Sequence, residues 1–276
     1  MKTILVPTDF SHTAINATNY AIDFAKQMRI DRIILFNAWQ PITFSDPMST
    51  LIMTEIESIK FVSSNGLEKE SKRLKEICPI HIKIDTVSEM ASIDSGIATI
   101  CEKGDISYII MGITGGSEIE QKLIGSNTIS VSQNNKVPVI IVPSSCKYQF
   151  ISKAMFLCDF KNIDSNFPEQ QLVNFLEVAM AELEVVNFDP DFTREQEEPA
   201  LEKFALNQIL RKYAPKYKYS LRNDFEDAVN EFAENDNVQL IINVSKKHSW
   251  FYNILHPSYT KKLAFHTKVP LMVIHA

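Results

Sequence analysis

The chain has 276 residues, of which 45% are hydrophobic, and its formal net charge at pH 7 is −6. This length favours two domains of ordinary size, and the hydrophobic content is sufficient for real cores. A negative balance without a dominant basic stripe argues against nucleic-acid binding. No apolar run reaches the roughly 18 residues of a membrane span, so we expect no membrane partner.

The cysteines and residues 1–9 indicate the cellular compartment in which the protein is expected. The cysteines at 78, 101, 146 and 158 are scattered and form no CxxC pair, which is typical of a reducing environment. A proline and an aspartate interrupt the apolar run within residues 1–9, so this segment does not have the pattern of a signal peptide. We therefore expect a cytoplasmic protein.

Short apolar runs alternate with segments of helical spacing along the first half of the chain. Such alternation predicts a parallel, doubly wound α/β sheet. The longest predicted helix contains Ser63–Gly66, where we leave a break open. We expect strands at 2–7, 32–38, 80–87, 106–111 and 137–142, helices at 11–29, 50–77, 93–102 and 126–133, and a loop at 41–47.

The second half repeats this pattern. Residues 153–160 echo the opening strand, and residues 268–274 echo 136–142, since both begin Lys-Val-Pro. The sequence therefore predicts a tandem duplication, with domains 1–145 and 150–276. Further strands are expected at 183–188, 217–221 and 238–243, and further helices at 195–213 and 225–232.

The predicted strand order within each domain is 3-2-1-4-5, as in Rossmann-like folds. In this order strands 1 and 4 are neighbours, and their connections leave in opposite directions. Ligands bind in the crevice beyond the carboxyl ends of such strands. The loops that follow these strands in the first domain are 7–12 and 112–126. We therefore expect Asp9 to face the second loop although about a hundred residues separate them in sequence.

Glycine is concentrated in that second loop. Four of the seven glycines of the chain fall within residues 112–125, and a serine follows at once. Glycine permits positive φ and close approach of a ligand to the backbone. A buried strand, a glycine-rich loop and a helix N-terminus together form a candidate phosphate-binding cradle.

The spacing Gly112-x2-Gly115-x9-Gly125-Ser126 resembles the ATP-binding signature of the universal stress protein family. The opening and closing strands, 6–11 and 137–142, are also similar to those of the family. The resemblance implies an adenine nucleotide alpha hydrolase-like fold and bound ATP, ADP or AMP, and it leaves Mg²⁺ open. It implies nucleotide contacts from Pro7, Thr8, Asp9, Asn37, Ala38, Met111, Gly112, Gly115, Gly116, Gly125, Ser126 and Asn127.

The resemblance also implies which part of the nucleotide each of these residues contacts. The adenine would lie near Asp9 and the end of strand 2, at Asn37 and Ala38. The first two glycines of the signature would run beside the ribose. The last glycine, with Ser126 and Asn127, would hold phosphate oxygens, and the free N–H groups of a helix start favour the same assignment independently.

The second domain lacks this loop chemistry. The residues predicted at the places of Gly112, Gly115 and Gly125 are Asn243, Lys246 and either His256 or Pro257. Side chains at positions that need positive φ cost about 1–2 kcal/mol each. We therefore predict a nucleotide site in the first domain and a degenerate second domain. Asp159 could still correspond to Asp9.

No catalytic residue and no metal ligand is predicted. The sequence has no P-loop, no pyrophosphatase Ser-Gly-Gly-x-Asp run and no nucleophile elbow. Our prediction is a stress-response sensor or regulator that binds a nucleotide. The alternatives are a nucleotide-independent interaction scaffold and a weak ATPase.

The last strands of the two domains bear on assembly. Both 137–142 and 271–274 are apolar, and an open apolar edge strand is a liability. The resemblance implies pairing through the last strand. Within one chain these two strands could pair with each other in an intramolecular pseudo-dimer, and a homodimer stays open.

Overall fold

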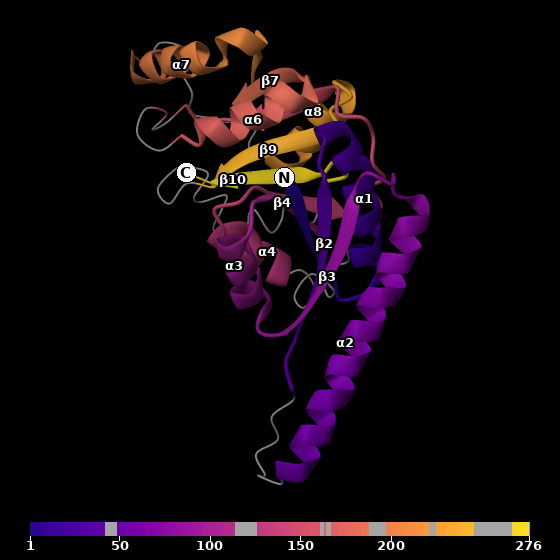
Figure 1. Cartoon of the computed structure of the whole chain (residues 1–276). Coiled ribbons are helices and arrows are strands. Elements are labelled where there is room, and N and C mark those ends of the chain that lie inside the picture. The colour runs from indigo at the N-terminus through magenta and orange to yellow at the C-terminus, as the bar shows by residue number, and fades with distance from the viewer. Residues whose placement is uncertain are drawn as a thin grey trace.

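The computed structural model describes residues 1–41, 49–113, 126–160, 163, 167–187, 197–220, 225–245 and 267–275. Strands and helices alternate through these residues (Figure 1). The strands are β1 (Thr3–Pro7), β2 (Arg32–Trp39), β3 (Lys83–Met90), β4 (Ile106–Ile113), β5 (Val139–Pro143), β6 (Lys153–Leu157), β7 (Glu182–Asn187), β8 (Lys216–Tyr219), β9 (Leu240–Ser245) and β10 (Leu271–His275). The helices are α1 (His12–Met28), α2 (Ser49–Ile77), α3 (Ile93–Lys103), α4 (Ser126–Asn134), α6 (Glu169–Ala179), α7 (Glu197–Leu210), the 3-10 helix η1 (Arg211–Tyr213) and α8 (Phe225–Asn235).

The ten strands of the described residues belong to one sheet, in the order β3-β2-β1-β4-β5-β10-β9-β6-β7-β8. Each half therefore has the order 3-2-1-4-5, which confirms the predicted α/β fold. The halves join where β10 pairs with β5 antiparallel, with Leu271 opposite Ile141 and Met272 opposite Ile140. The other pairings of the described sheet are parallel. The two sheets predicted for the two domains are thus one continuous sheet.

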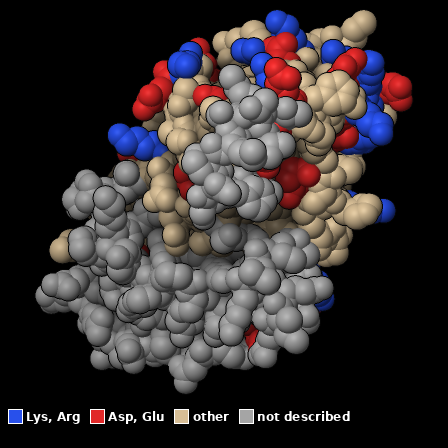
Figure 2. Space-filling model, turned by 90° about the horizontal axis from the view of Figure 1, so that it is seen from below, with Lys and Arg blue, Asp and Glu red and all other residues tan. Residues whose placement is uncertain are grey.

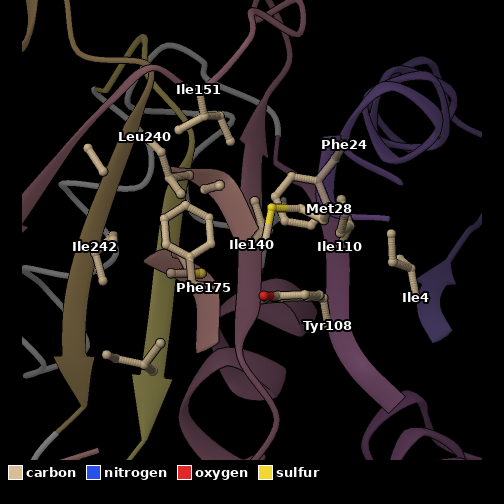
Figure 3. Close-up of a cluster of buried hydrophobic side chains, with 14 of the residues drawn as sticks. Ile4, Phe24, Met28, Tyr108, Ile110, Ile140, Ile151, Phe175, Leu240 and Ile242 are labelled. Carbon is tan, nitrogen blue, oxygen red and sulfur yellow. The ribbon is translucent and has the colours of Figure 1, made fainter. Parts of the chain in front are cut away.

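Helices cover both faces of this sheet, and each face has one hydrophobic core that continues from the first half into the second. The first core packs α1, α2, α6 and α7 on the sheet, and the second packs α3, α4 and α8 on the opposite face. Ile4 belongs to the first core and Leu5 to the second, as the alternation of a strand requires. Figure 3 shows the first core passing from Ile4 through Ile140 to Ile242.

The structure answers one point that the sequence left open and moves the start of one predicted strand. Helix α2 runs from Ser49 to Ile77 without a break. Gly66 lies inside it and packs against Phe10, since a Cβ atom at Gly66 would lie 2.6 Å from the ring of Phe10. Strand β3 begins at Lys83 rather than at 80, since the amide of Ile82 closes a turn onto the carbonyl of Pro79.

Helix α6 was not among the expected elements. It buries Leu172, Phe175 and Leu176 and packs against α1, so it is part of the junction between the halves. Among the described residues, no helix combines the length and apolarity required to cross a membrane. On the face shown in Figure 2, described basic and acidic side chains are interspersed.

Candidate functional site

A cavity of about 430 Å³ lies at the carboxyl ends of β1, β2 and β4, where the strand order reverses. This is the edge at which doubly wound sheets bind ligands. Several residues predicted from the sequence share its wall. They are Pro7, Thr8, Asp9, Asn37, Ala38, Met111, Gly112 and Asn127.

The remaining predicted residues belong to the segment between β4 and α4. Gly115, Gly116 and Gly125 lie outside the described residues, so their roles stay predictions. Ser126 is the first residue of α4. Asp9 and Gly112 line the same cavity, as the switch-point reasoning expects.

A tight turn after β1 forms one wall of the cavity. The amide of Phe10 donates to Oγ1 of Thr8, and the amide of Ser11 donates to Oδ1 of Asp9, both at 3.0 Å. Ser11 then caps α1 by accepting a hydrogen bond from the amide of Ala14. Phe10 has a φ of 64°, a conformation uncommon for a residue other than glycine. Side-chain bonds thus fix a strained turn that presents the exposed Asp9 to the cavity.

Asn37 holds this turn against β2. Its Nδ2 donates to the carbonyl oxygen of Thr8 at 2.7 Å, and the amide of Thr8 donates to the carbonyl of Phe36 at 2.8 Å. One hydrogen of the Asn37 carboxamide is therefore committed to the protein. Its Oδ1 can accept a hydrogen bond from a ligand, and the second hydrogen of Nδ2 can be donated.

Gly112 has a packing role that its glycine-rich context did not reveal. A Cβ atom on Gly112 would lie 2.3 Å from the carbonyl oxygen of Thr13, so any side chain would collide with the start of α1. Because that oxygen belongs to the backbone, a rotamer change cannot relieve the collision. Gly112 therefore lets α1 approach β4 closely, and both Thr13 and Gly112 line the cavity.

Helix α4 points its N-terminus toward the cavity. Thr128 lies in the wall and its Oγ1 donates to the carbonyl of Gly112 at 3.0 Å, which ties the helix to β4. At the other end of α4, Nε2 of His275 donates to the carbonyl of Ser132 at 2.7 Å. Burial lowers the pKa of His275, and this hydrogen bond offsets only part of that decrease. The free N–H groups at the helix start are suited to anions.

The cavity has one further wall that the sequence reasoning missed, formed by the end of β2 and the loop after β3. Trp39 and Ser92 lie there with Asp94. Oδ2 of Asp94 accepts a hydrogen bond from Oγ of Ser130 at 2.9 Å, whereas its Oδ1 is buried without a partner. The sequence could have predicted this wall, because the carboxyl ends of all parallel strands meet at one edge of a sheet and the loop after β3 follows such an end.

The model of the universal stress protein family matches residues 1–143, slightly more than half of the 276 residues. The chain belongs to the universal stress protein family. Universal stress protein MJ0577 from Methanocaldococcus jannaschii is 28% identical over 153 residues, which cover 51% of this chain and 94% of that protein. Universal stress protein MJ0531 from the same organism is 27% identical over 143 residues, covering 51% and 81%.

A solved structure extends the likeness to the second half. The crystal structure of a universal stress protein from Archaeoglobus fulgidus aligns with 99% of this chain and 98% of its own, with a TM-score of 0.72 and 16% identity. At this identity the likeness concerns the fold alone. Two consecutive units of the family fold account for the ten-stranded sheet.

The second unit of this universal stress protein repeats the turn after the first strand. Nδ2 of Asn187 donates to the carbonyl of Cys158 at 2.9 Å, and Phe160 has a φ of 50°. Asp159 therefore takes the position of Asp9. Asp159 is buried whereas Asp9 is exposed, so the two carboxylates have different surroundings.

The strand register corrects one sequence alignment between the units. Gly112 lies opposite Val142 in β5, and Val244 lies opposite Ile274 in β10. Val142 and Ile274 are the same position of the repeated closing strand. Val244, rather than Asn243, therefore corresponds to Gly112, and the second unit carries a branched side chain there. The alignment slipped by one residue because no glycine of the second unit anchors it.

The described lining of the first-unit cavity is acidic. Its charged side chains are Asp9 and Asp94, and the described lining contains no lysine, arginine or histidine. Among the described residues of the chain, no cluster of three or more potential metal ligands exists. In the described part, an anionic ligand would thus be received by N–H groups and neutral side chains.

Proposed function

We propose that this universal stress protein binds ATP or a related adenine nucleotide in the cavity of its first unit and acts as a stress-response sensor or regulator. One observation carries the proposal. The turn at Asp9, the end of β2 and the start of α4 converge on a cavity of about 430 Å³. That volume is in the range of small-molecule sites. The glycine spacing of the chain supports the choice of an adenine nucleotide.

The proposed roles follow the order of the elements along the cavity. The adenine lies at the Asp9 side, where Oδ1 of Asn37 can accept a hydrogen bond and Ala38 leaves room. The ribose lies beside Gly112 and Gly115. Phosphate oxygens lie at Gly125, Ser126 and Asn127, because N–H groups at a helix start and its positive dipole end favour anions.

Mg²⁺ fits only as a companion of the nucleotide. Magnesium sites commonly combine one or two carboxylates with phosphate oxygens and water. Because Asp9 lies on the side of the cavity assigned to the adenine, the proposal assigns no protein ligand to the cation. The cation would supply charge neutralisation of the phosphates, which the described acidic lining does not provide.

Binding rather than turnover is the proposed activity. Efficient phosphoryl transfer requires charge stabilisation and a positioned nucleophile. The described wall offers two carboxylates and no basic residue for that purpose. Bound nucleotide would instead favour one arrangement of residues 112–126 and so change the surface offered to a partner.

Calorimetric titration with ATP, ADP and AMP tests the proposal. Wild-type protein should bind, and Gly115→Arg should abolish binding because a large side chain enters the predicted ribose site. Gly104→Arg is the matched control, since Gly104 is exposed with ordinary neighbours and lies outside the cavity. A wild-type protein that is inert to all three nucleotides at millimolar levels rejects the proposal.

Two further experiments separate the alternatives. If Gly125→Arg abolishes nucleotide binding but leaves the cellular stress phenotype intact, the protein acts as a nucleotide-independent scaffold. Single-turnover hydrolysis of ATP that is lost in Asp9→Asn would identify a weak ATPase. The cytoplasmic location stays a prediction.

We also infer an intramolecular pseudo-dimer. The antiparallel pairing of β5 with β10 supports it, because it lets each unit cover the apolar last strand of the other. A monomer of 31.4 kDa in light scattering agrees with this arrangement. A mass of twice that value would indicate that a homodimer forms in addition.

A further inference from the structure

A second cavity, of about 410 Å³, lies at the opposite edge of the first-unit sheet. Its wall includes Lys2 beside the start of β1, Ser107 and Tyr108 near the start of β4, and Lys136 before β5. Helix α6 of the second unit closes it with Asn174 and neighbouring residues. The cavity therefore exists at the junction of the two units and needs both of them.

The charges of this cavity are not balanced within the described part of the chain. The ammonium groups of Lys2 and Lys136 have no carboxylate within salt-bridge distance there. The carboxylate in the wall is Glu177, and Lys212 pairs with it at 2.9 Å. Two lysines thus face the cavity without a counter-charge, while the acidic group is already paired.

The rest of the wall is largely apolar. Met28, Val137, Pro138 and Val178 contribute to it. The ring of Tyr108 extends from β4 toward the strand of Ile140 (Figure 3). The cavity thus combines an apolar part with a polar part of similar extent, so it suits a ligand that has both an apolar body and a charged group.

One polar side chain of the wall serves the fold and another is free to bind. Nε2 of Gln171 donates to the carbonyls of Lys136 and His275, and its Oε1 accepts from the amide of His275. Gln171 therefore fixes α6 against β5 and β10. Asn174 accepts from Gln170 through Oδ1, so its amide nitrogen can donate to a ligand.

We propose that this junction cavity binds a small organic anion, a phosphate or carboxylate attached to an apolar body. Lys2 and Lys136 receive the anionic group, with the amide of Asn174 as a further donor. The apolar body lies against Met28, Val137 and the ring of Tyr108. Because residues of both units touch it, the ligand stabilises their packing.

The position of the cavity gives such a ligand a second effect. Strands β1 and β4 start at this cavity and end at the first-unit cavity, where Thr8 and Gly112 lie. An anion at one edge therefore contacts the same two neighbouring strands as a ligand at the other edge. The binding itself does not depend on the proposed nucleotide function.

Amide-resolved NMR of the full chain tests this proposal, with phenyl phosphate, benzoate and neutral phenol as probes. Phenyl phosphate or benzoate should shift the amide signals of Ser107, Lys136 and Asn174, and phenol should bind more weakly. Inorganic phosphate alone should also bind more weakly, because it lacks the apolar body. A response to phenyl phosphate but not to benzoate identifies the phosphate as the recognised group, and the converse identifies the carboxylate.

Substitutions of the lysines complete the test. Lys136→Gln should weaken the binding of the responding probe about tenfold, as expected when one charge-assisted contact is lost. Lys69→Gln removes an exposed lysine on α2 and should leave the affinity unchanged. The proposal is overturned if neither anion shifts these signals at about 10 mM, which is about ten times a weak Kd of about 1 mM. It is also overturned if Lys136→Gln and Lys69→Gln bind equally well.

Nucleotide binding is tested separately in the same samples. The described wall of the junction cavity contains no residue of the segment 112–126, so Gly115→Arg should retain anion binding at Lys136 while it loses ATP. Failure of one activity therefore does not imply failure of the other.

Discussion

The side chain of Asn37 donates a hydrogen bond to the carbonyl of Thr8 at 2.7 Å, and this contact joins the ends of β1 and β2 at the candidate site. The second unit repeats it, with Asn187 bonded to Cys158 at 2.9 Å. The same local bond therefore stands in two units whose neighbouring loops differ in sequence. Asn37 and Asn187 are therefore a matched pair of positions at which an effect on stability can be separated from an effect on ligand binding.

Replacing either asparagine by alanine should destabilise the protein. Each change leaves a strand-end carbonyl without its donor, which costs about 1–3 kcal/mol. Only Asn37→Ala should weaken ATP binding, because Asn37 lines the cavity and Asn187 belongs to the other unit. Urea unfolding measures the first effect and calorimetry the second. Equal loss of ATP affinity in both variants would mean that the effect comes from general destabilisation.

Gly112→Ala should lower both stability and nucleotide affinity. The added Cβ would lie 2.3 Å from the carbonyl oxygen of Thr13, so α1 must move away from β4. Overpacking of this kind costs about 1–3 kcal/mol in the free energy of unfolding. Gly104→Ala is the control, since its nearest neighbour is 3.5 Å away, and it should change stability by less than about 0.5 kcal/mol. A Gly112→Ala protein as stable as wild type would show that this close packing is unnecessary.

Protonation of His275 should destabilise the protein. Burial lowers its pKa from the ordinary value of 6.5, so the unfolded chain takes up the proton before the folded protein does. The free energy of unfolding therefore falls as pH decreases from 6.5 toward the lowered pKa, by at most about 1.4 kcal/mol per pH unit. His275→Gln keeps a donor for Ser132 and should reduce this slope in urea unfolding at several pH values. A slope that is unchanged in His275→Gln would contradict this prediction.

The pairing of β5 with β10 should couple the two units energetically. Ile140 lies opposite Met272 across that pair, and both are fully buried in the same core. Each change to alanine should cost about 2–5 kcal/mol. In a double-mutant cycle the two should couple by about 0.5–3 kcal/mol, whereas Ile33→Ala with Met272→Ala should be additive within about 0.5 kcal/mol. Additivity of the first pair would contradict a packed junction.

Much of the fold could be read from periodicity and repetition. The alternation of apolar runs with helical segments predicted a parallel sheet in each half, and the repeated Lys-Val-Pro motif located the two closing strands. The continuity of the longest helix was less certain from the sequence, because a glycine can stand either inside a helix or at a break in it. Gly66 permitted a break by local propensity, but Phe10 packs there and the helix continues.

The candidate site was predictable where topology alone brings residues together. Strand order placed Asp9 beside Gly112, and both line the cavity. The wall at Asp94 was not predicted, because the loop after β3 has no distinctive motif. The packing role of Gly112 was also hidden, since a glycine in a glycine-rich segment has a sufficient explanation without it.

The sequence by itself determined the family and the alternation of strands and helices in the two repeated halves, because these depend on local periodicity and motif spacing. Tertiary structure alone decided that Gly112 must accommodate Thr13, that Val244 is its counterpart and that α6 closes a second cavity over Lys2. The physical reason is distance along the chain. Contacts between residues that are far apart in sequence leave no periodic signal, and they arise only when the packed elements fix which atoms meet.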